Sequence, residues 1–213
     1  MTIYMFPGQG SQMKGMGIEL FSHFPDKIKQ ADDILGYSIK ELCLDDPKQQ
    51  LSHTEYTQPA LYVIEALSYL ARVEEEARPK YLIGHSLGEY AALFAAGVFD
   101  FVTGLKLVQK RGELMAKTNG GGMLAVINLS EERIKFLLQA NGLDTIDFAN
   151  FNSPKQIVLS GPAADITKTH ELLATEALMC VPLKVSGAFH SRYMQSAANE
   201  FKEFIDTVEL SAL

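Results

Sequence analysis

The segment 84–88 reads Gly-His-Ser-Leu-Gly and places Ser86 between two glycines. It follows the short apolar run 80–83 and precedes the helix-forming run 89–96, so the pattern predicts a strand, a sharp turn and a helix that ends at Gly97. Such a turn strains the central serine, and the two glycines avoid collisions that side chains would cause. The first N–H groups of the new helix would then face an oxyanion formed at Ser86. The spacing indicates a nucleophilic serine, although an ordinary loop can contain the same residues.

Arg111 lies within a helix that we expect to begin after the N-cap Asp100 and to run to about Thr118. It follows Val108 by three residues and precedes Met115 by four, so it occupies the apolar stripe of that helix. A guanidinium there needs an anion or several acceptors, because burial of an unpaired charge is strongly unfavourable. A carboxylate of the protein and a carboxylate of a ligand fit the pattern equally well.

His190 is the best candidate for a general base among the five histidines. It follows the run 185–189 and precedes a helix expected over 192–207, which places it in a loop at a helix start. The other four histidines are either in polar, surface-like contexts (His23, His53 and His170) or fixed beside the serine (His85). A loop histidine can also simply be solvated, so the residues alone leave both interpretations open.

The elements that position these residues belong to an ordinary globular chain of 213 residues, 47% hydrophobic and 21% charged, which can bury a sizeable core. The net charge of −7 argues against a nucleic-acid surface, which needs clustered basic residues. No run approaches the roughly 20 apolar residues of a membrane span, and the amino terminus lacks a signal-peptide layout, so we expect a cytoplasmic protein. Cys43 and Cys180 lie far apart and fit reduced thiols better than a disulfide or a zinc site.

The first half of the chain predicts two strands, at 2–6 and 80–83, with several helices between them, and we expect an α/β protein. We expect a strand at 2–6, a helix near 15–21, helices at 25–35 and 38–43, and a long helix that opens at 57–59 and continues toward Glu76. The loop 7–12 is rich in glycine. It can bring backbone N–H groups close to a ligand, or it can be a plain tight turn.

The pattern changes from Met123 onward. Strands are expected at 123–128, 146–151, 156–160 and 178–182, with helices at 130–140 and 162–175. The order strand-helix-strand-strand-helix-strand is that of a ferredoxin-like unit. We therefore expect a large subdomain formed by residues 1–121 and 184–213, and an inserted ferredoxin-like subdomain formed by residues 122–183.

Six short motifs, in order over almost the whole chain, carry a resemblance that none of them carries alone. They are Phe-Pro-Gly-Gln-Gly-Ser-Gln at 6–12, Thr-Gln-Pro-Ala at 57–60, Gly-His-Ser-Leu-Gly-Glu at 84–89, Gln-Lys-Arg-Gly at 109–112, Asn-Ser-Pro-Lys-Gln-Ile-Val at 152–158, and Gly-Ala-Phe-His-Ser at 187–191. Together they resemble the malonyl-CoA:acyl carrier protein transacylase family, which includes the stand-alone acyltransferases of polyketide synthesis. The resemblance implies a hydrolase-like large subdomain with a parallel sheet and a serine at a nucleophile elbow, beside the ferredoxin-like insert.

The resemblance also implies a mechanism. Malonyl-CoA would form a malonyl ester on Ser86, and His190 would take the serine proton and later activate the phosphopantetheine thiol of an acyl carrier protein. Arg111 would pair with the free malonyl carboxylate, and the backbone N–H groups of Gln9 and Leu87 would form the oxyanion hole.

Further expectations concern selectivity, cofactors and partners. In this family a phenylalanine before the histidine, here Phe189, accompanies malonyl preference. The reaction would use no metal and no redox cofactor, and the partners would be malonyl-CoA and an acyl carrier protein, with no nucleic acid and no membrane. Fatty-acid and polyketide synthesis share all these residues, so the pathway, the particular carrier protein and the oligomeric state stay open.

Family members usually continue well beyond the equivalent of Leu213, so a carboxy-terminal part is expected to be missing here, and with it a carbonyl that orients His190. Two other functions stay open. A hydrolase would release the Ser86 ester to water, and Asp144, Asp147 and Asp165 lie between Ser86 and His190, although none stands out as its acid. The second alternative is a non-catalytic module that docks carrier proteins. The presence of Ser86, His190 and Arg111 argues against this alternative.

Overall fold

The computed structural model describes residues 2–212. The chain divides into two compact units, Met1–Glu113 with Glu203–Leu213, and Leu114–Lys202. The predicted subdomain boundaries, at 121/122 and 183/184, differ from this division. Helices α6 (Phe101–Ala116) and α9 (Gln195–Ile205) each continue from one unit into the other, so the observed divisions fall inside helices rather than in loops. The two units are described separately below.

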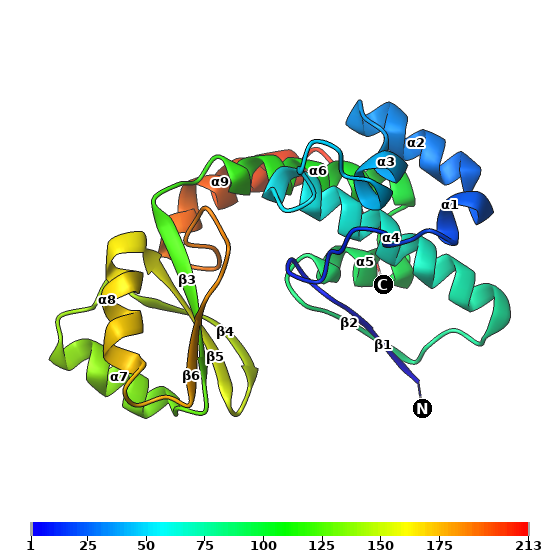
Figure 1. Ribbon diagram of the computed structural model, residues 1–213. Coiled ribbons are helices and arrows are strands. Elements are labelled where there is room, and N and C mark those ends of the chain that lie inside the picture. The colour runs from blue at the N-terminus through cyan, green and yellow to red at the C-terminus, as the bar shows by residue number, and fades with distance from the viewer. Residues whose placement is uncertain (1, 213) are drawn as a thin grey trace. The chain divides into compact units, whose positions relative to one another are not determined.

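The first unit contains a two-stranded parallel sheet, as predicted. Strand β1 (Ile3–Phe6) pairs with β2 (Tyr81–Gly84), with Ile3 opposite Tyr81 and Phe6 opposite Gly84. Helix α5 (Gly88–Ala96) follows β2 at once, packs against both strands, and ends at Gly97 in the left-handed conformation. The expected succession of strand, turn and capped helix is thereby confirmed (Figure 1).

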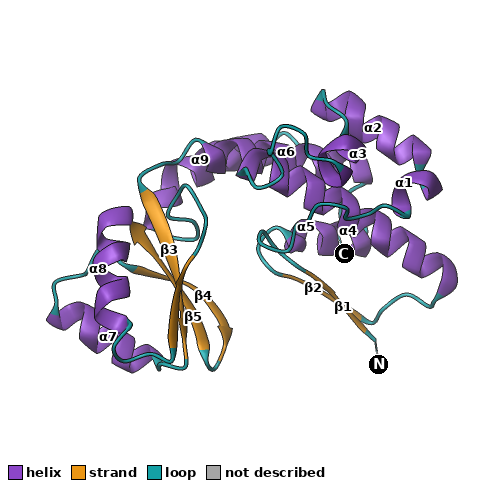
Figure 2. Cartoon of the chain, in the orientation of Figure 1, coloured by secondary structure: helices purple, strands orange, loops and turns teal. Residues whose placement is uncertain are grey.

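Four further helices complete the amino-terminal part of this unit (Figure 2). They are α1 (Leu20–His23), α2 (Pro25–Leu35), α3 (Ile39–Leu44) and α4 (Thr54–Glu75). The prediction of a helix near 15–21 was wrong, because Gly15 and Gly17 adopt positive φ angles of 92° and 77°, which no right-handed helix contains. Helix α4 begins three residues before the predicted start and includes Pro59.

Helix α4 forms the core of the first unit. Its central residues Tyr62, Val63, Ala66 and Leu67 are fully buried. The hydroxyl of Tyr62 donates to the carbonyl of Phe101 at 3.2 Å, and the rings of these two residues stack with centroids 5.9 Å apart. A well-packed helix therefore supports the start of α6, the helix that carries Arg111.

The second unit has the predicted order of elements: β3 (Gly121–Ile127), α7 (Glu131–Ala140), β4 (Asp147–Ser153), β5 (Gln156–Pro162), α8 (Ala163–Leu173) and β6 (Met179–Pro182). The strands form one antiparallel sheet in the order β4-β5-β3-β6. A 3₁₀ turn (Arg192–Met194) then leads into α9.

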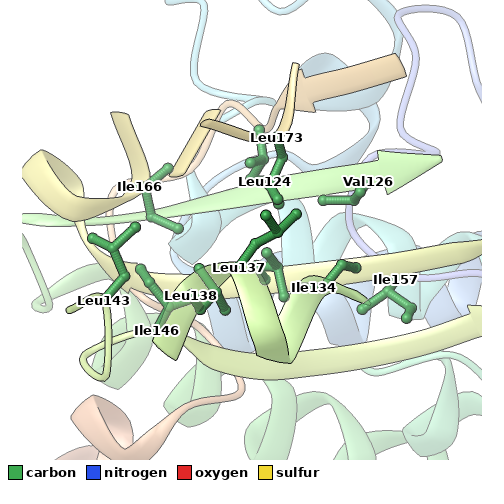
Figure 3. Close-up of a cluster of buried hydrophobic side chains, with 11 residues drawn as sticks. Leu124, Val126, Ile134, Leu137, Leu138, Leu143, Ile146, Ile157, Ile166 and Leu173 are labelled. Atoms are coloured by element: carbon green, nitrogen blue, oxygen red, sulfur yellow. The ribbon is translucent and has the colours of Figure 1, made fainter. Parts of the chain in front are cut away.

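Apolar clusters lie on both faces of the two central strands of this sheet, β3 and β5, within the second unit. On β3, Leu124 and Val126 point into a cluster with residues of α7 and α8, and Leu124, Val126, Ile134, Leu159 and Leu173 are all fully buried (Figure 3). The alternate residues Met123 and Ala125 belong to a second cluster, with Phe189. Among residues 2–212, no helix is both long and apolar enough to span a membrane.

Candidate active site

The turn between β2 and α5 holds Ser86 with a φ of 54°, in the left-handed region that L residues seldom adopt. The flanking glycines are required by close backbone contacts. A Cβ at Gly84 would lie 2.2 Å from the backbone N of Glu89, and a Cβ at Gly88 would lie 2.1 Å from the carbonyl oxygen of Phe6. Side chains at positions 84 and 88 would therefore collide with the backbone, as the sequence predicted, and glycine avoids these collisions. The strained backbone of Ser86 lies directly before the N-terminus of α5.

The glycine-rich loop after β1 lies against this turn. The N–H of His85 donates to the carbonyl of Phe6 at 2.9 Å, and Gly88 packs against the carbonyls of Phe6 and Pro7. Because β1 and β2 are parallel, their carboxyl ends meet at one edge, where open α/β sheets place ligands. Within residues 2–212, the backbone N–H groups of Gln9 and Leu87 donate to no other backbone carbonyl. Both candidate oxyanion donors thus lie at the ligand edge of the sheet.

Arg111 lies beside the serine. Its Nη2 donates to Ser86 Oγ at 3.2 Å and its Nη1 to Gln58 Oε1 at 2.7 Å, and its guanidinium carbon lies 5.6 Å from the centre of the Tyr90 ring. Burial lowers the pKa of Arg111 from its ordinary value, while Tyr90 and Glu89 raise it. An arginine keeps its charge under such a shift.

The sequence left open whether Arg111 pairs with a carboxylate of the protein. Within residues 2–212 it forms no ion pair with an acidic side chain. Its polar contacts are with neutral groups, those of Gln58, Ser86 and Tyr90. A partly buried positive charge surrounded by neutral acceptors favours an anion from outside the protein.

Three residues of this site were missed by sequence reasoning. Gln58 is 1% exposed and accepts from Arg111, Tyr90 supplies the aromatic ring beside the guanidinium, and Thr54 accepts from the side chain of Gln9 at 3.1 Å. Thr54 and Gln58 are four residues apart on α4 and therefore share one face. A signal existed, because a glutamine and a threonine within the buried start of an apolar helix need internal partners.

The structure places His190 and Phe189 in the second unit. His190 is exposed and has a φ of 58°, so Ser86 and His190 are both among the five non-glycine residues with positive φ within residues 2–212. Phe189 is 4% exposed and packs in the cluster of Met123 and Ala125. The Ser191 hydroxyl donates to the carbonyl of Ala188, which closes the loop around the histidine. The catalytic role of His190 and the selectivity role of Phe189 stay predictions.

Two of the three aspartates considered as a hydrolase acid have other partners. Asp147 accepts from the backbone N and the Nε of Arg192, both at 2.8 Å, and this contact lowers the pKa of Asp147. Asp165 accepts from Lys168 and from Thr145 at 2.8 and 2.7 Å. Among the described residues, no group of three or more histidine, cysteine, aspartate or glutamate side chains has the arrangement of a metal site.

The sequence of this chain matches a known enzyme family. The family model described as "Acyl transferase domain" matches residues 3–211. The chain belongs to this family, and within it to the malonyl CoA-acyl carrier protein transacylases, as the motifs predicted.

Relatives and solved structures agree on this assignment. The polyketide biosynthesis malonyl CoA-acyl carrier protein transacylase BaeC of Bacillus velezensis is 52% identical over 216 residues, covering 100% of this chain and 75% of BaeC. The polyketide biosynthesis protein PksE of Bacillus subtilis is 55% identical, and the chain spans 28% of it. The malonyl CoA-acyl carrier protein transacylase of Burkholderia pseudomallei superimposes with a TM-score of 0.96 at 48% identity, covering 98% of this chain and 72% of that one.

A complex is also among the similar structures. PlMCAT:AntF, a type II PKS acyl-carrier protein in complex with its malonyl-transacylase, matches with a TM-score of 0.88 at 33% identity, over 98% of this chain and 71% of the transacylase.

Proposed function

We propose that this chain transfers a malonyl group from malonyl-CoA to the phosphopantetheine thiol of an acyl carrier protein, and so supplies extender units to polyketide or fatty-acid synthesis. Family membership and the names of the relatives support this activity. The single observation that carries it is Arg111, which forms no ion pair with an acidic side chain within residues 2–212 and whose Nη2 lies 3.2 Å from Ser86 Oγ.

The proposed first step acylates the serine. Ser86 Oγ attacks the thioester carbon of malonyl-CoA while His190 takes the hydroxyl proton, and the C–S bond then breaks as the leaving thiolate takes that proton. In the second step the carrier thiol gives its proton to His190 and its sulfur attacks the ester carbon, and the bond from that carbon to Ser86 Oγ then breaks as the serine oxygen takes the proton from His190. The acyl group only changes from sulfur to oxygen and back, so we propose that no metal and no redox cofactor takes part.

Arg111 supplies the proposed selectivity. In a malonyl ester of Ser86 a single methylene separates the ester carbonyl from the free carboxylate, so a guanidinium that already contacts Oγ is within reach of that carboxylate. Gln58 and Tyr90 hold the guanidinium and leave further N–H groups for the ligand. An acetyl group would leave the partly buried charge unpaired, which disfavours it.

The proposed roles of the remaining parts follow from their positions. We propose that the Ser86 turn is a nucleophile elbow, supported by its φ and by the close contacts of Gly84 and Gly88. The N–H groups of Gln9 and Leu87 are the proposed oxyanion hole. The order β4-β5-β3-β6 supports a ferredoxin-like subdomain, and the free thiols of Cys43 and Cys180 support a reducing, cytoplasmic location.

The test is to incubate the purified chain with malonyl-CoA, with acetyl-CoA, and with a phosphopantetheinylated carrier protein, and to follow both proteins by intact mass. A malonyl adduct that forms on the chain and then appears on the carrier is expected. An adduct lost to water would instead indicate a hydrolase, and no adduct from either donor would contradict a catalytic role.

A further inference from the structure

The loop 7–12 contains Gln9, whose backbone N–H is one of the two proposed oxyanion donors. Most hydrogen bonds of this loop are local. Ser11 donates to the carbonyl of Gly8 from its hydroxyl at 2.8 Å and from its backbone N at 3.3 Å. Such bonds shape the loop without fixing it against Ser86. An oxyanion donor is effective only when its N–H is held where the negative charge develops, so the loop needs an anchor on another element.

The side chain of Gln9 supplies this anchor. Its Nε2 donates to Oγ1 of Thr54, the first residue of α4, at 3.1 Å. Within residues 2–212 this is the only side-chain hydrogen bond that joins the loop 7–12 to a residue outside the loop. Thr54 is buried, so little water competes for its hydroxyl. The contact therefore restrains the residue that carries the proposed oxyanion donor.

The start of α4 is itself held on two sides. The hydroxyl of Thr57 donates to the carbonyls of Leu51 and His53 at 2.7 and 3.0 Å, which ties the helix to the preceding turn. Gly112 of α6 lies so close that a Cβ there would be 3.2 Å from the carbonyl oxygen of Thr54. A helix start fixed in this way positions a side chain more precisely than a loop does.

The same face of α4 also holds Arg111. Gln58 lies one helical turn after Thr54 and accepts from Arg111 Nη1 at 2.7 Å, while Arg111 Nη2 donates to Ser86 Oγ at 3.2 Å. Two side chains one turn apart on a helix keep a fixed separation. Thr54 and Gln58 therefore set the distance between the two groups that would bind the ester carbonyl and the free carboxylate of a malonyl group.

We propose that Thr54 is a positioning residue of the transfer reaction, and that its hydroxyl acts through the side chain of Gln9 to hold the Gln9 N–H where the oxyanion forms. The inference rests on the proposed malonyl transfer and extends it to a residue that acts only through another. The oxyanion exists in the transition state and not in bound malonyl-CoA. Loss of the contact therefore slows acylation and leaves substrate binding unchanged.

Two substitutions of Thr54 test this role. Thr54→Val keeps the shape of the side chain and removes the acceptor, whereas Thr54→Ser keeps the hydroxyl. Formation of the malonyl adduct is followed by intact mass over a range of malonyl-CoA concentrations. The saturating rate should fall about tenfold in Thr54→Val, which is less than the loss of an oxyanion donor causes, because the donor is displaced and not removed. The half-saturating concentration should not change, and Thr54→Ser should restore the rate.

Thr57→Val is the matched control. Thr57 is a second buried threonine of α4, and its hydroxyl bonds to backbone carbonyls instead of to the loop. We expect Thr57→Val to lower the midpoint of thermal unfolding and to leave the acylation rate unchanged. Equal losses of rate in Thr54→Val and Thr57→Val would mean that the helix start acts through stability alone, which overturns the proposal.

Gln9→Ala tests whether Thr54 acts through Gln9. Alanine keeps the backbone N–H and lacks the amide that Thr54 holds, so Gln9→Ala should slow acylation as much as Thr54→Val does. The double variant should be no slower than either single variant, because both remove the same contact. Losses that multiply in the double variant would overturn this part of the proposal.

The outcomes separate this inference from the proposed function. A wild type that forms no malonyl adduct contradicts the proposed function, and this inference with it. A wild type that is acylated no faster than Thr54→Val leaves the transfer intact and overturns the role of Thr54. Amide hydrogen exchange, measured by NMR without substrate, gives an independent result. The Gln9 N–H should exchange faster in Thr54→Val than in the wild type and Thr57→Val, and equal exchange in all three overturns the anchoring contact.

Discussion

The two units differ in how completely each satisfies its own groups. In the second unit the central strands β3 and β5 pack into apolar clusters on both faces, and Arg133 and Arg192 are paired with Glu176 and Asp147. In the first unit one face of the sheet is exposed, and within residues 2–212 the Glu65 carboxyl oxygens have no hydrogen-bond partner and Arg111 donates hydrogen bonds to neutral groups.

This difference indicates that the second unit is mainly structural and that the first unit carries the reactive residues. The second unit uses its charged residues in ion pairs of its own, whereas the first unit holds a cation beside a strained serine. Violations of packing and pairing rules concentrate where a protein binds or reacts. Ser86 and Arg111 are therefore the residues of the first unit to which we assign a ligand.

The largest effect on stability should come from a substitution in β3, the central strand of the sheet in the second unit. Leu124→Ala removes a fully buried side chain from β3 and should lower the free energy of unfolding by about 3 kcal/mol. Met5→Ala removes a side chain of similar size from the exposed face of β1 and should cost less than about 0.5 kcal/mol. Urea denaturation of both variants measures the contrast, and equal losses would remove the distinction between the two sheets.

Arg111→Ala should change acyl preference more than stability. Removal of a charge-assisted pair is worth about 2 kcal/mol, or roughly a thirtyfold loss of preference for malonyl-CoA over acetyl-CoA. Arg133→Ala, which removes an arginine already paired with Glu176, is the control and should leave the preference unchanged. Competition between the two donors, read by adduct mass, gives the ratio. An unchanged ratio in Arg111→Ala would make this arginine structural.

The buried carboxyl group of Glu65 should make stability depend on pH. Burial raises the pKa of Glu65 to about 8 from an ordinary value of 4.5. Between these values the unfolded chain has lost the proton and the folded chain still holds it, so stability falls as pH rises, by up to about 1.4 kcal/mol per pH unit. Denaturation at pH 5 to 8 should show this slope in the wild type and in Glu171→Gln, an exposed control, but not in Glu65→Gln.

The smallest expected effect on stability comes from the ion pair between Arg192 and Asp147 on the surface of the second unit. Arg192 lowers the pKa of Asp147, so their contact stabilises the fold above the ordinary aspartate value of 3.8 and is lost as pH falls below it. Arg192→Ala should therefore destabilise the chain slightly near pH 6 and less at pH 3. A constant difference across this range, measured by thermal unfolding, would mean that the side chain acts through packing instead.

Local sequence patterns predicted most of the elements. Pro25 and Ser38 mark the starts of α2 and α3, and the period-two apolar residues of β3 alternate between two clusters as a covered strand requires. The helix at 15–21 failed because two glycines adopt positive φ there, which composition alone does not reveal. The unit boundaries could not be predicted, since α6 and α9 run through them without a break in pattern.

The part of the candidate site formed by one continuous motif could be predicted from the sequence. The contacts between residues far apart in the sequence could not. The Ser86 turn follows from five consecutive residues. The partners of Arg111 come from α4 and α5, and no local pattern joins Gln58 to a residue 53 positions later. Glu65 was overlooked because the helix contains other charged residues, and the lack of a hydrogen-bond partner for its carboxyl group within residues 2–212 becomes visible only in three dimensions.

The most direct test of the account is the site of malonyl attachment. The wild type, Ser86→Ala and the control Ser196→Ala are incubated with malonyl-CoA, digested, and mapped by peptide mass. We predict a malonyl group on the peptide that contains Ser86 in the wild type and in Ser196→Ala, and none in Ser86→Ala. Undiminished malonylation of Ser86→Ala would contradict the assignment of Ser86 as the nucleophile and the function derived from it.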